Sequence, residues 1–232
     1  DTAMTERNVS DAPFDVRTCE LVTISTGVHA RTIGELRQAV AIVPEGCLHY
    51  HFWGRRLRPQ IGETEYFNDF AEWIARSLRD ITLAERLSAV NPEEHESLEG
   101  VRREILGRID ERMDEDDSLT WAKSDHPFFF VRAQILVFPT DKRFSGVEEL
   151  PEAVSSFDRG SVFYHIIDAR RRTRAKEDDI SSWLAGFGSR TDSLRRKLGR
   201  IDPFIFALDQ LREEIVAAVR GDGTGSEGRS PE

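Results

Sequence analysis

The chain repeats itself, and this internal similarity constrains its possible folds more than any single motif does. Similar residues recur in the same order along the 232 residues. The matched pairs are Leu21-Val22 with Leu136-Val137, Glu35-Leu36 with Glu149-Leu150, Tyr50-His51 with Tyr164-His165, Trp73 with Trp183, and Leu98 with Leu208. The offset is 115 near the start (136 − 21), 114 in the middle (164 − 50) and 110 later (183 − 73). This collinear match predicts two copies of one structural unit.

The two copies divide the chain into five segments. Residues 1–13 and 221–232 have little to bury, and we expect a disordered head and a disordered tail there. Repeat 1 covers residues 14–112, an acidic linker covers 113–128, and repeat 2 covers 129–220. We expect the two repeats to form one compact domain.

Each copy is predicted to begin with one strand. Val16 to Ile24 and Val131 to Phe138 are rich in apolar and β-branched residues, which is typical of strands. A lone strand leaves backbone groups unpaired on both edges, so we expect it to pair with the equivalent strand of the other copy.

The rest of each copy is predicted to be helical. Thr32 to Glu35 has the pattern of a capping box, and Pro44 ends that helix. The last helix of each copy shows an apolar stripe, made of Leu98, Val101, Ile105 and Ile109 in one and of Leu208, Leu211, Ile215 and Val219 in the other. The predicted fold class is mainly α (α+β): two tandem helical repeats, each with one N-terminal strand, packed as an internal pseudo-two-fold dimer.

Charge and composition exclude several classes of partner. Lys and Arg number 32 and Asp and Glu number 42, so the net charge is −10, with a pI near 5.2. This acidity argues against nucleic acid and against an anionic membrane surface as partner. The chain has no apolar run that approaches the roughly 20 residues of a membrane helix. The segment from Asp1 to Pro13 has no apolar core, and Cys19 and Cys47 lack metal-ligand spacing, so we expect a cytoplasmic protein with reduced, buried thiols.

The familiar catalytic motifs are missing. The sequence has no Gly-x-Gly-x-x-Gly, P-loop, His-Glu-x-x-His, nucleophile elbow or Cys-x-x-Cys. We therefore expect no cofactor and no metal, and we favour a protein without catalytic activity.

One polar motif is repeated and forms the candidate site. Tyr50-His51 is followed five residues later by Arg56, and Tyr164-His165 is followed in the same way by Arg170. In one interpretation the rings are half-buried and their polar tips bond backbone carbonyls or an opposite Asp. In the other, Tyr50, His51, Arg56, Tyr164, His165 and Arg170 line one groove at the seam between the repeats. A metal site is disfavoured, because Phe163 stands where the first copy has His49.

Several segments also carry a resemblance to a known family. They are Arg17-Thr18-Cys19-Glu20-Leu21-Val22-Thr23, Tyr50-His51-Phe52-Trp53, Asn68-Asp69-Phe70-Ala71-Glu72-Trp73, and Phe163-Tyr164-His165 with Arg170-Arg171. They resemble an uncharacterised prokaryotic family labelled only as a domain of unknown function, over nearly all of residues 14–220. The resemblance implies the duplicated layout and a cytoplasmic protein, but no activity.

The sequence as a whole favours a non-catalytic binding or regulatory module that takes a small anionic ligand or a partner protein at the seam. One alternative is an enzyme that acts on a small phosphorylated or carbohydrate-like substrate with a His as acid and base. Another is an acidic scaffold that holds a partner protein. In the binding interpretation, replacing both histidines and both arginines abolishes binding with little loss of stability.

Overall fold

The computed structural model describes residues 12–57, 66–116, 119, 121–173 and 175–223. The chain divides into two compact units where the sequence predicts one domain. Unit 1 comprises residues 1–20 and 136–232, and unit 2 comprises residues 21–135. The expected head lies, except for its last two residues, outside the described part of the chain.

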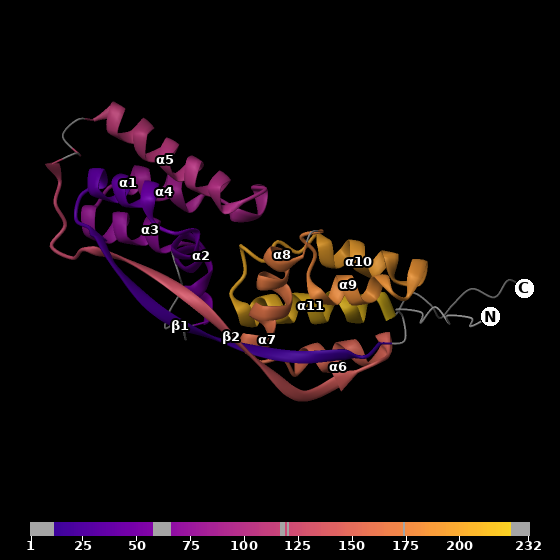
Figure 1. Cartoon of the computed structure of the whole chain (residues 1–232). Helices are drawn as coiled ribbons and strands as arrows, with labels where there is room; N and C mark the ends of the chain where they lie inside the picture. Colours follow the sequence, from indigo (N-terminus) through magenta and orange to yellow (C-terminus); the bar gives the residue numbers. More distant parts are fainter. Residues whose placement is uncertain (1–11, 58–65, 117–118, 120, 174, 224–232) are drawn as a thin grey trace, which may run out of the picture. The chain divides into compact units, whose positions relative to one another are not determined.

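Two long strands form the sheet, and both units share them. β1 runs over Phe14–Ala30 and β2 over Phe128–Phe144, each 17 residues long. They lie side by side in Figure 1. The hydroxyl of Thr26, late in β1, donates to the carbonyl of Phe130, early in β2. Thr140, late in β2, donates in the same way to Val16. The strands are therefore antiparallel.

The prediction of a mainly α fold is wrong, because the protein is α+β. Each strand extends about twice as far as its apolar run suggests, through Ser25 to Ala30 in β1 and Pro139 to Phe144 in β2. These extensions are polar and contain Gly27 and Pro139, which usually mark loops. A two-stranded ribbon leaves much of both faces in water, so polar residues and an edge proline cost it little.

Unit 2 continues from β1 into a layer of helices. They are α1 (Ile33–Ile42), α2 (Glu45–Trp53) with the 3₁₀ turn η2 (Gly54–Leu57), α3 (Asp69–Trp73), the π-helix η3 (Ile74–Leu78), α4 (Ile81–Ser88), the 3₁₀ turn η4 (Pro92–Glu94) and α5 (Leu98–Glu115). Half of the predicted capping box of α1 is present: Thr32 accepts the Glu35 amide at 3.1 Å, but the Glu35 carboxylate accepts the amide of Arg31, one residue before the N-cap. Leu36, Phe70, Leu83 and Ile105 are fully buried in this layer.

Unit 1 continues from β2 into a second layer of helices. They are the 3₁₀ turn η6 (Val147–Glu149), α6 (Leu150–Ser155), α7 (Arg159–Val162), the π-helix η7 (Phe163–Asp168), α8 (Ala169–Arg172), α9 (Asp179–Ala185), the 3₁₀ turn η8 (Gly188–Thr191), α10 (Asp192–Gly199) and α11 (Leu208–Gly223). The helix α11 continues through Gly223, three residues into the expected tail. The remainder of that tail is outside the described residues.

Each helical layer is completed by the first residue of a strand that continues into the other unit. In unit 2 the ring of Phe128, from β2, packs at 4.7 Å from His51 and 5.1 Å from Phe70. In unit 1 the ring of Phe14, from β1, packs at 4.8 Å from His165. The indoles of Trp73 and Trp183 each hold a chain segment. Trp73 donates to the carbonyl of His126, and Trp183 donates to the carbonyl of Ala12.

These contacts correct the alignment of the strands. The sequence pairs Phe14 with Phe129 at an offset of 115, whereas the structure gives Phe14 and Phe128 the same environment, 114 apart. Thr26 and Thr140 follow the same spacing (140 − 26). Because a shift of one residue turns a strand side chain to the opposite face, Phe129 is exposed and Phe128 is buried.

Candidate functional site

His51 ties a strand to the helices of unit 2. Its Nδ1 lies 2.9 Å from the Asp69 carboxylate, at the start of α3. Its Nε2 accepts the backbone N–H of Val131, in β2, at 3.2 Å. The ring is almost completely buried, at 3% exposure, and Tyr50 packs edge-on against it. We call Tyr50, His51 and Asp69 the unit 2 cluster.

His165 makes the same connections in unit 1. Its Nδ1 lies 2.8 Å from the Asp179 carboxylate, and its Nε2 accepts the backbone N–H of Arg17, in β1, at 2.9 Å. Tyr164 packs edge-on against the ring, as Tyr50 does. Tyr164, His165 and Asp179 form the unit 1 cluster.

The strand amides fix the protonation of both rings. A backbone N–H can only donate, so Nε2 must carry a lone pair, and the ring proton then sits on Nδ1 and faces the carboxylate. Both nitrogens of each imidazole are therefore engaged by the fold. Of the two interpretations of the motif, this geometry favours the structural one, with an Asp as partner and a strand amide in place of a backbone carbonyl.

Arg172, from α8, fills the space next to the unit 1 cluster. Its guanidinium lies 4.0 Å from the centre of the Tyr164 ring. It donates to Asp179 at 2.9 Å, to Asp168 at 2.8 Å and to the carbonyl of Tyr164 at 3.0 Å. Such stacking combined with carboxylate bonds is characteristic of guanidinium groups.

A cavity of about 370 Å³ borders the unit 2 cluster. Its described lining is aromatic and charged, and consists of Tyr50, His51, Asp69, Glu72, Trp73, Arg76, Ser77, Phe128, Phe129 and Val131. Glu72 and Arg76 form an ion pair at 2.7 Å, and the arginine side chain is 70% exposed. Phe129 is 58% exposed at this cavity. The unit 2 cluster thus lies at an accessible hollow.

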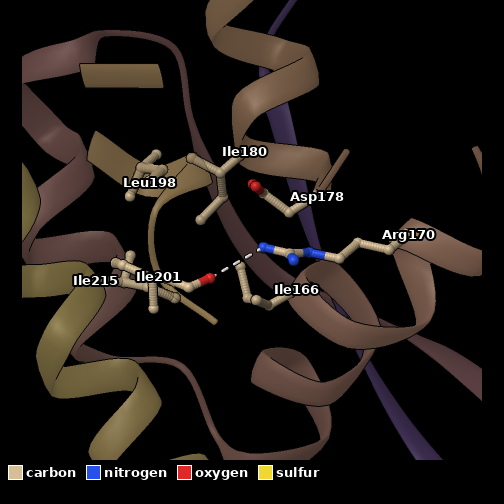
Figure 2. A pocket seen from close by; sticks show the side chains of 7 residues that line it. All are labelled: Ile166, Arg170, Asp178, Ile180, Leu198, Ile201 and Ile215. Carbon is tan, nitrogen blue, oxygen red and sulfur yellow. Dashed lines mark hydrogen bonds between the residues drawn. The ribbon is translucent and has the colours of Figure 1, made fainter. Parts of the chain in front are cut away.

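The two arginines of the motif lie elsewhere. Arg56 is buried, with its guanidinium 4.8 Å from the centre of the Trp53 ring. Arg170 lines a separate cavity of about 10 Å³, the size of one water molecule, and donates to the carbonyl of Ile201 at 3.4 Å (Figure 2). Asp178 faces the same small cavity in Figure 2. Each arginine belongs to the same unit as its Tyr-His pair, and a groove shared by all six residues stays a prediction.

Burial raises the pKa of three groups, the Asp178 carboxyl and the thiols of Cys19 and Cys47. Burial raises the pKa of the Asp178 carboxyl, against the hydrogen bonds from Ser181 and the charge of Arg170. Burial also raises the pKa of the Cys19 thiol, to about 12, and that of Cys47. Both thiols are free. Among the described residues no group of three or more His, Cys, Asp or Glu is placed to hold a metal ion.

The sequence analysis missed three parts of the site. It did not assign Asp69 and Asp179 as the histidine partners, although they recur at the same offset of 110 as Trp73 and Trp183. It missed the strand amides because backbone donors leave no sequence signal. It also did not place Arg172 next to Tyr164.

Comparisons with known proteins place these features in a family. The model of a family described as "Family of unknown function (DUF5752)" matches residues 11–220. A solved structure, described as OrfY from Thermoproteus tenax, is 26% identical, with a TM-score of 0.74 over 92% of this chain and 97% of that one. A search of curated proteins gave no match. In the described part of the chain, no helix is long and apolar enough to cross a membrane.

Proposed function

We propose that this chain, which belongs to the family of unknown function DUF5752, is a non-catalytic binding protein whose ligand cavity lies in unit 2. The observation that carries the proposal is the hollow of about 370 Å³ beside the unit 2 cluster. Its volume is within the range of small-molecule and side-chain pockets, and its lining combines aromatic faces with a few charged groups.

The state of the histidines supports the absence of catalysis. A histidine that works as acid and base must exchange a proton with the ligand. Both nitrogens of His51 are engaged, one by Asp69 and one by the Val131 amide, and the ring is 3% exposed. His165 is held identically. The enzyme alternative, which depends on one of these two rings, therefore has no support from the geometry.

The backbone of the cavity rim supports a binding role. Arg76 and Ser77 line the cavity from η3, and π-helices are rare and concentrated at functional sites. The segment ends at Arg79 in the left-handed region, with φ of 59°. That conformation is unfavourable for a residue other than glycine and is often kept where it shapes a site.

The charges of the lining favour some ligands over others. In the described part of the lining, Asp69 and Glu72 bring two carboxylates to the cavity and Arg76 brings one guanidinium. These described residues favour a small anion or a phosphorylated substrate less than a neutral or cationic group. The proposed ligand is therefore a group on a partner protein rather than a free anion.

Internal duplication completes the proposal. Matched element order and matched His–Asp–amide connections in the two units support descent from one repeated ancestor. After duplication, both clusters kept their structural role, and the cavity of unit 2 acquired the binding role.

The test is a binding experiment on the full chain with a panel of capped tripeptides Gly-X-Gly, where X is Arg, Lys, Phe or Glu. The indole N–H signal of Trp73 reports on the cavity, and that of Trp183, in unit 1, is the internal control. We expect at least one peptide to shift Trp73 and not Trp183. Phe129→Ala, at the cavity, should weaken this binding, whereas Phe138→Ala, at an exposed position of β2 in unit 1, should not. If no peptide shifts Trp73 more than Trp183, the cavity is not a ligand site.

A further inference from the structure

We infer that unit 1 carries a second binding surface, on the exposed side of α10, which holds an acidic segment of a partner protein. Arg190, Arg196 and Arg200 form this surface, and we call them the α10 arginines. They belong to a different unit from the proposed ligand cavity. The inference therefore goes beyond the proposed function and does not depend on it.

The helix α10 has one apolar side and one cationic side. Leu194 and Leu198, four residues apart, are 2% and 4% exposed, and the helix packs against α9 and α11 (Figure 1). Arg196 and Arg200, also four residues apart, are exposed and lie on the side opposite the leucines. The helical backbone continues through Arg200, with φ of −85° and ψ of −14°. Arg190 is exposed in η8, the turn that leads into the helix.

The α10 arginines differ from the exposed arginines that pair within the chain. Arg37, for example, donates from its Nε and one terminal nitrogen to both carboxylate oxygens of Asp110. Among the described residues, none of the α10 arginines forms an ion pair, because the carboxylates of Asp192 and Glu177 both pair with Arg195. A carboxylate from another molecule can bind these guanidinium groups in the way that Asp110 binds Arg37.

Packing of the helix does not require these cations. The helix α4 of unit 2 also has eight residues and a buried leucine pair, Leu83 and Leu87. Residues 79–89, around α4, hold two cations and two carboxylates and have no net charge, whereas residues 190–200, around α10, hold five cations and one carboxylate, a net charge of +4. The buried leucines therefore do not explain the charge of α10.

The helix dipole explains only part of this charge. A dipole favours cations in the last turn, where Arg196 and Arg200 lie, but it disfavours a cation at Arg190, just before the first turn. Like charges four residues apart, as at Arg196 and Arg200, also destabilise a helix. The three arginines together thus cost the helix stability that an acidic partner would return.

The shape and charge of the surface favour an acidic protein segment over a nucleic acid. Arg196 and Arg200 are separated by about 6 Å along the helix axis, and alternate residues of an extended peptide are about 6.6 Å apart, so a Glu-x-Glu segment matches them. A nucleic acid needs many neutralised phosphates, whereas this surface offers three arginines on a chain with a net charge of −10. A short segment with a few carboxylates meets far less long-range repulsion.

The experiment follows the backbone amide signals of the full chain while a capped peptide is added. The probe is acetyl-Glu-Ser-Glu-Ser-Glu-amide, and the same peptide with Gln in place of Glu is the neutral control. We expect the acidic peptide to shift the Arg196 and Arg200 signals to saturation and the neutral one to shift neither. Raising NaCl from about 0.02 M to about 0.2 M should weaken the binding by about tenfold, because salt screens exposed charges.

Two double variants remove the same charge from different places. Arg196→Gln with Arg200→Gln should weaken binding of the acidic peptide by about tenfold or more. Arg103→Gln with Arg132→Gln, at exposed positions of unit 2, should change it by less than about twofold. Both variants should melt at the wild-type temperature, since the four side chains are exposed.

The other outcomes overturn the inference. It is wrong if the acidic peptide shifts neither signal, or if both double variants lose binding equally, because the attraction then belongs to the whole chain. It is also wrong if single-stranded hexathymidylate or phosphatidylserine vesicles bind the α10 arginines more tightly than the peptide does, because the surface then serves phosphates. None of these results affects the proposed cavity, which the Trp73 indole signal tests separately.

Discussion

The two units build the same His–Asp–amide connection and differ in the packing next to it. In unit 1, Arg172 packs on Tyr164, and Gly160 lets a helix approach the strand closely. In unit 2, a cavity borders Tyr50, and the corresponding Gly46 has no close neighbour on the strand. The comparison indicates that the connection is a shared part of the fold, whereas the packing next to it differs between the units.

The largest expected effect comes from removing the shared connection. His51→Phe keeps an aromatic ring beside Phe128 but removes the acceptor of the Val131 N–H and the histidine bond of Asp69. His165→Phe removes the acceptor of the Arg17 N–H and one of the two donors to Asp179, which keeps its bond from Arg172. Each change should lower the free energy of unfolding by roughly 2–4 kcal/mol, measured by urea denaturation. The sequence-based expectation of nearly unchanged stability is replaced by this one.

Hydrogen exchange sharpens this first prediction. His51→Phe should reduce protection of the Val131 amide and leave that of Arg17, and His165→Phe should do the reverse. His29→Phe, at an exposed position of β1, is the control and should change stability by less than about 0.5 kcal/mol. Equal loss of protection at both amides in either variant would contradict the assignment of each connection to its own unit.

The next effect tests how closely the strands approach the helices. A Cβ on Gly160 would lie 2.4 Å from the Cys19 carbonyl oxygen and 2.4 Å from the Thr18 hydroxyl, so Gly160→Ala should destabilise the protein by about 1–3 kcal/mol. A Cβ on Gly46 would lie 3.9 Å from the nearest atom, on Arg132, so Gly46→Ala should be neutral or stabilising by up to about 1 kcal/mol. Thermal melts of the two variants decide this, and similar losses in both would show that the strands lie equally close in the two units.

A smaller effect concerns one residue of each unit whose backbone lies in the left-handed region. Unit 2 uses Arg79 (φ 59°), and unit 1 uses Gly188 (φ 68°). Gly188→Ala should cost about 1 kcal/mol, because an L side chain strains this conformation. Arg79→Gly relieves that strain but adds freedom to the unfolded chain, so its stability should lie within about 1 kcal/mol of the wild type. Urea denaturation of both variants measures this, and a large loss in Arg79→Gly would reveal a contact of the arginine that stabilises unit 2.

The sequence predicts the helices and the repeated motif well because their signals are local. Thr32 caps α1 as predicted by accepting the Glu35 amide, and the apolar stripe from Val101 to Ile109 is buried. The chemistry of the motif could not be predicted, because it depends on a backbone donor, at Val131, that any residue other than proline supplies.

The strands show a second limit of the sequence. Their length and register depend on pairing between segments about a hundred residues apart, and polar stretches such as Ser25 to Ala30 carry no strand signal of their own. The one-residue error in alignment arose because Phe128, Phe129 and Phe130 are identical in type, and only the helices they face distinguish them.

The last prediction concerns the caps of two equivalent helices. Asp178 caps α9 by accepting the Ser181 amide at 2.7 Å, and at the matching position Asn68 caps α3 by accepting the Ala71 amide at 2.9 Å (178 − 110 = 68). Burial raises the pKa of Asp178 above its ordinary value of 3.8, so the folded state holds the proton more tightly than the unfolded state does. The wild type should therefore lose stability as the pH rises from about 3.8 through the raised pKa.

Asp178→Asn keeps the cap and removes this titration, as unit 2 already does with Asn68. The difference in unfolding free energy between the variant and the wild type should therefore grow in favour of the variant as the pH rises through that window, measured by urea denaturation at a series of pH values. Other carboxyl groups titrate in both proteins and cancel in the difference. If the difference instead shifts toward the wild type at higher pH, the charge of Arg170 outweighs the burial of Asp178. The Asp178 cap would then differ from the Asn68 cap by an ion pair.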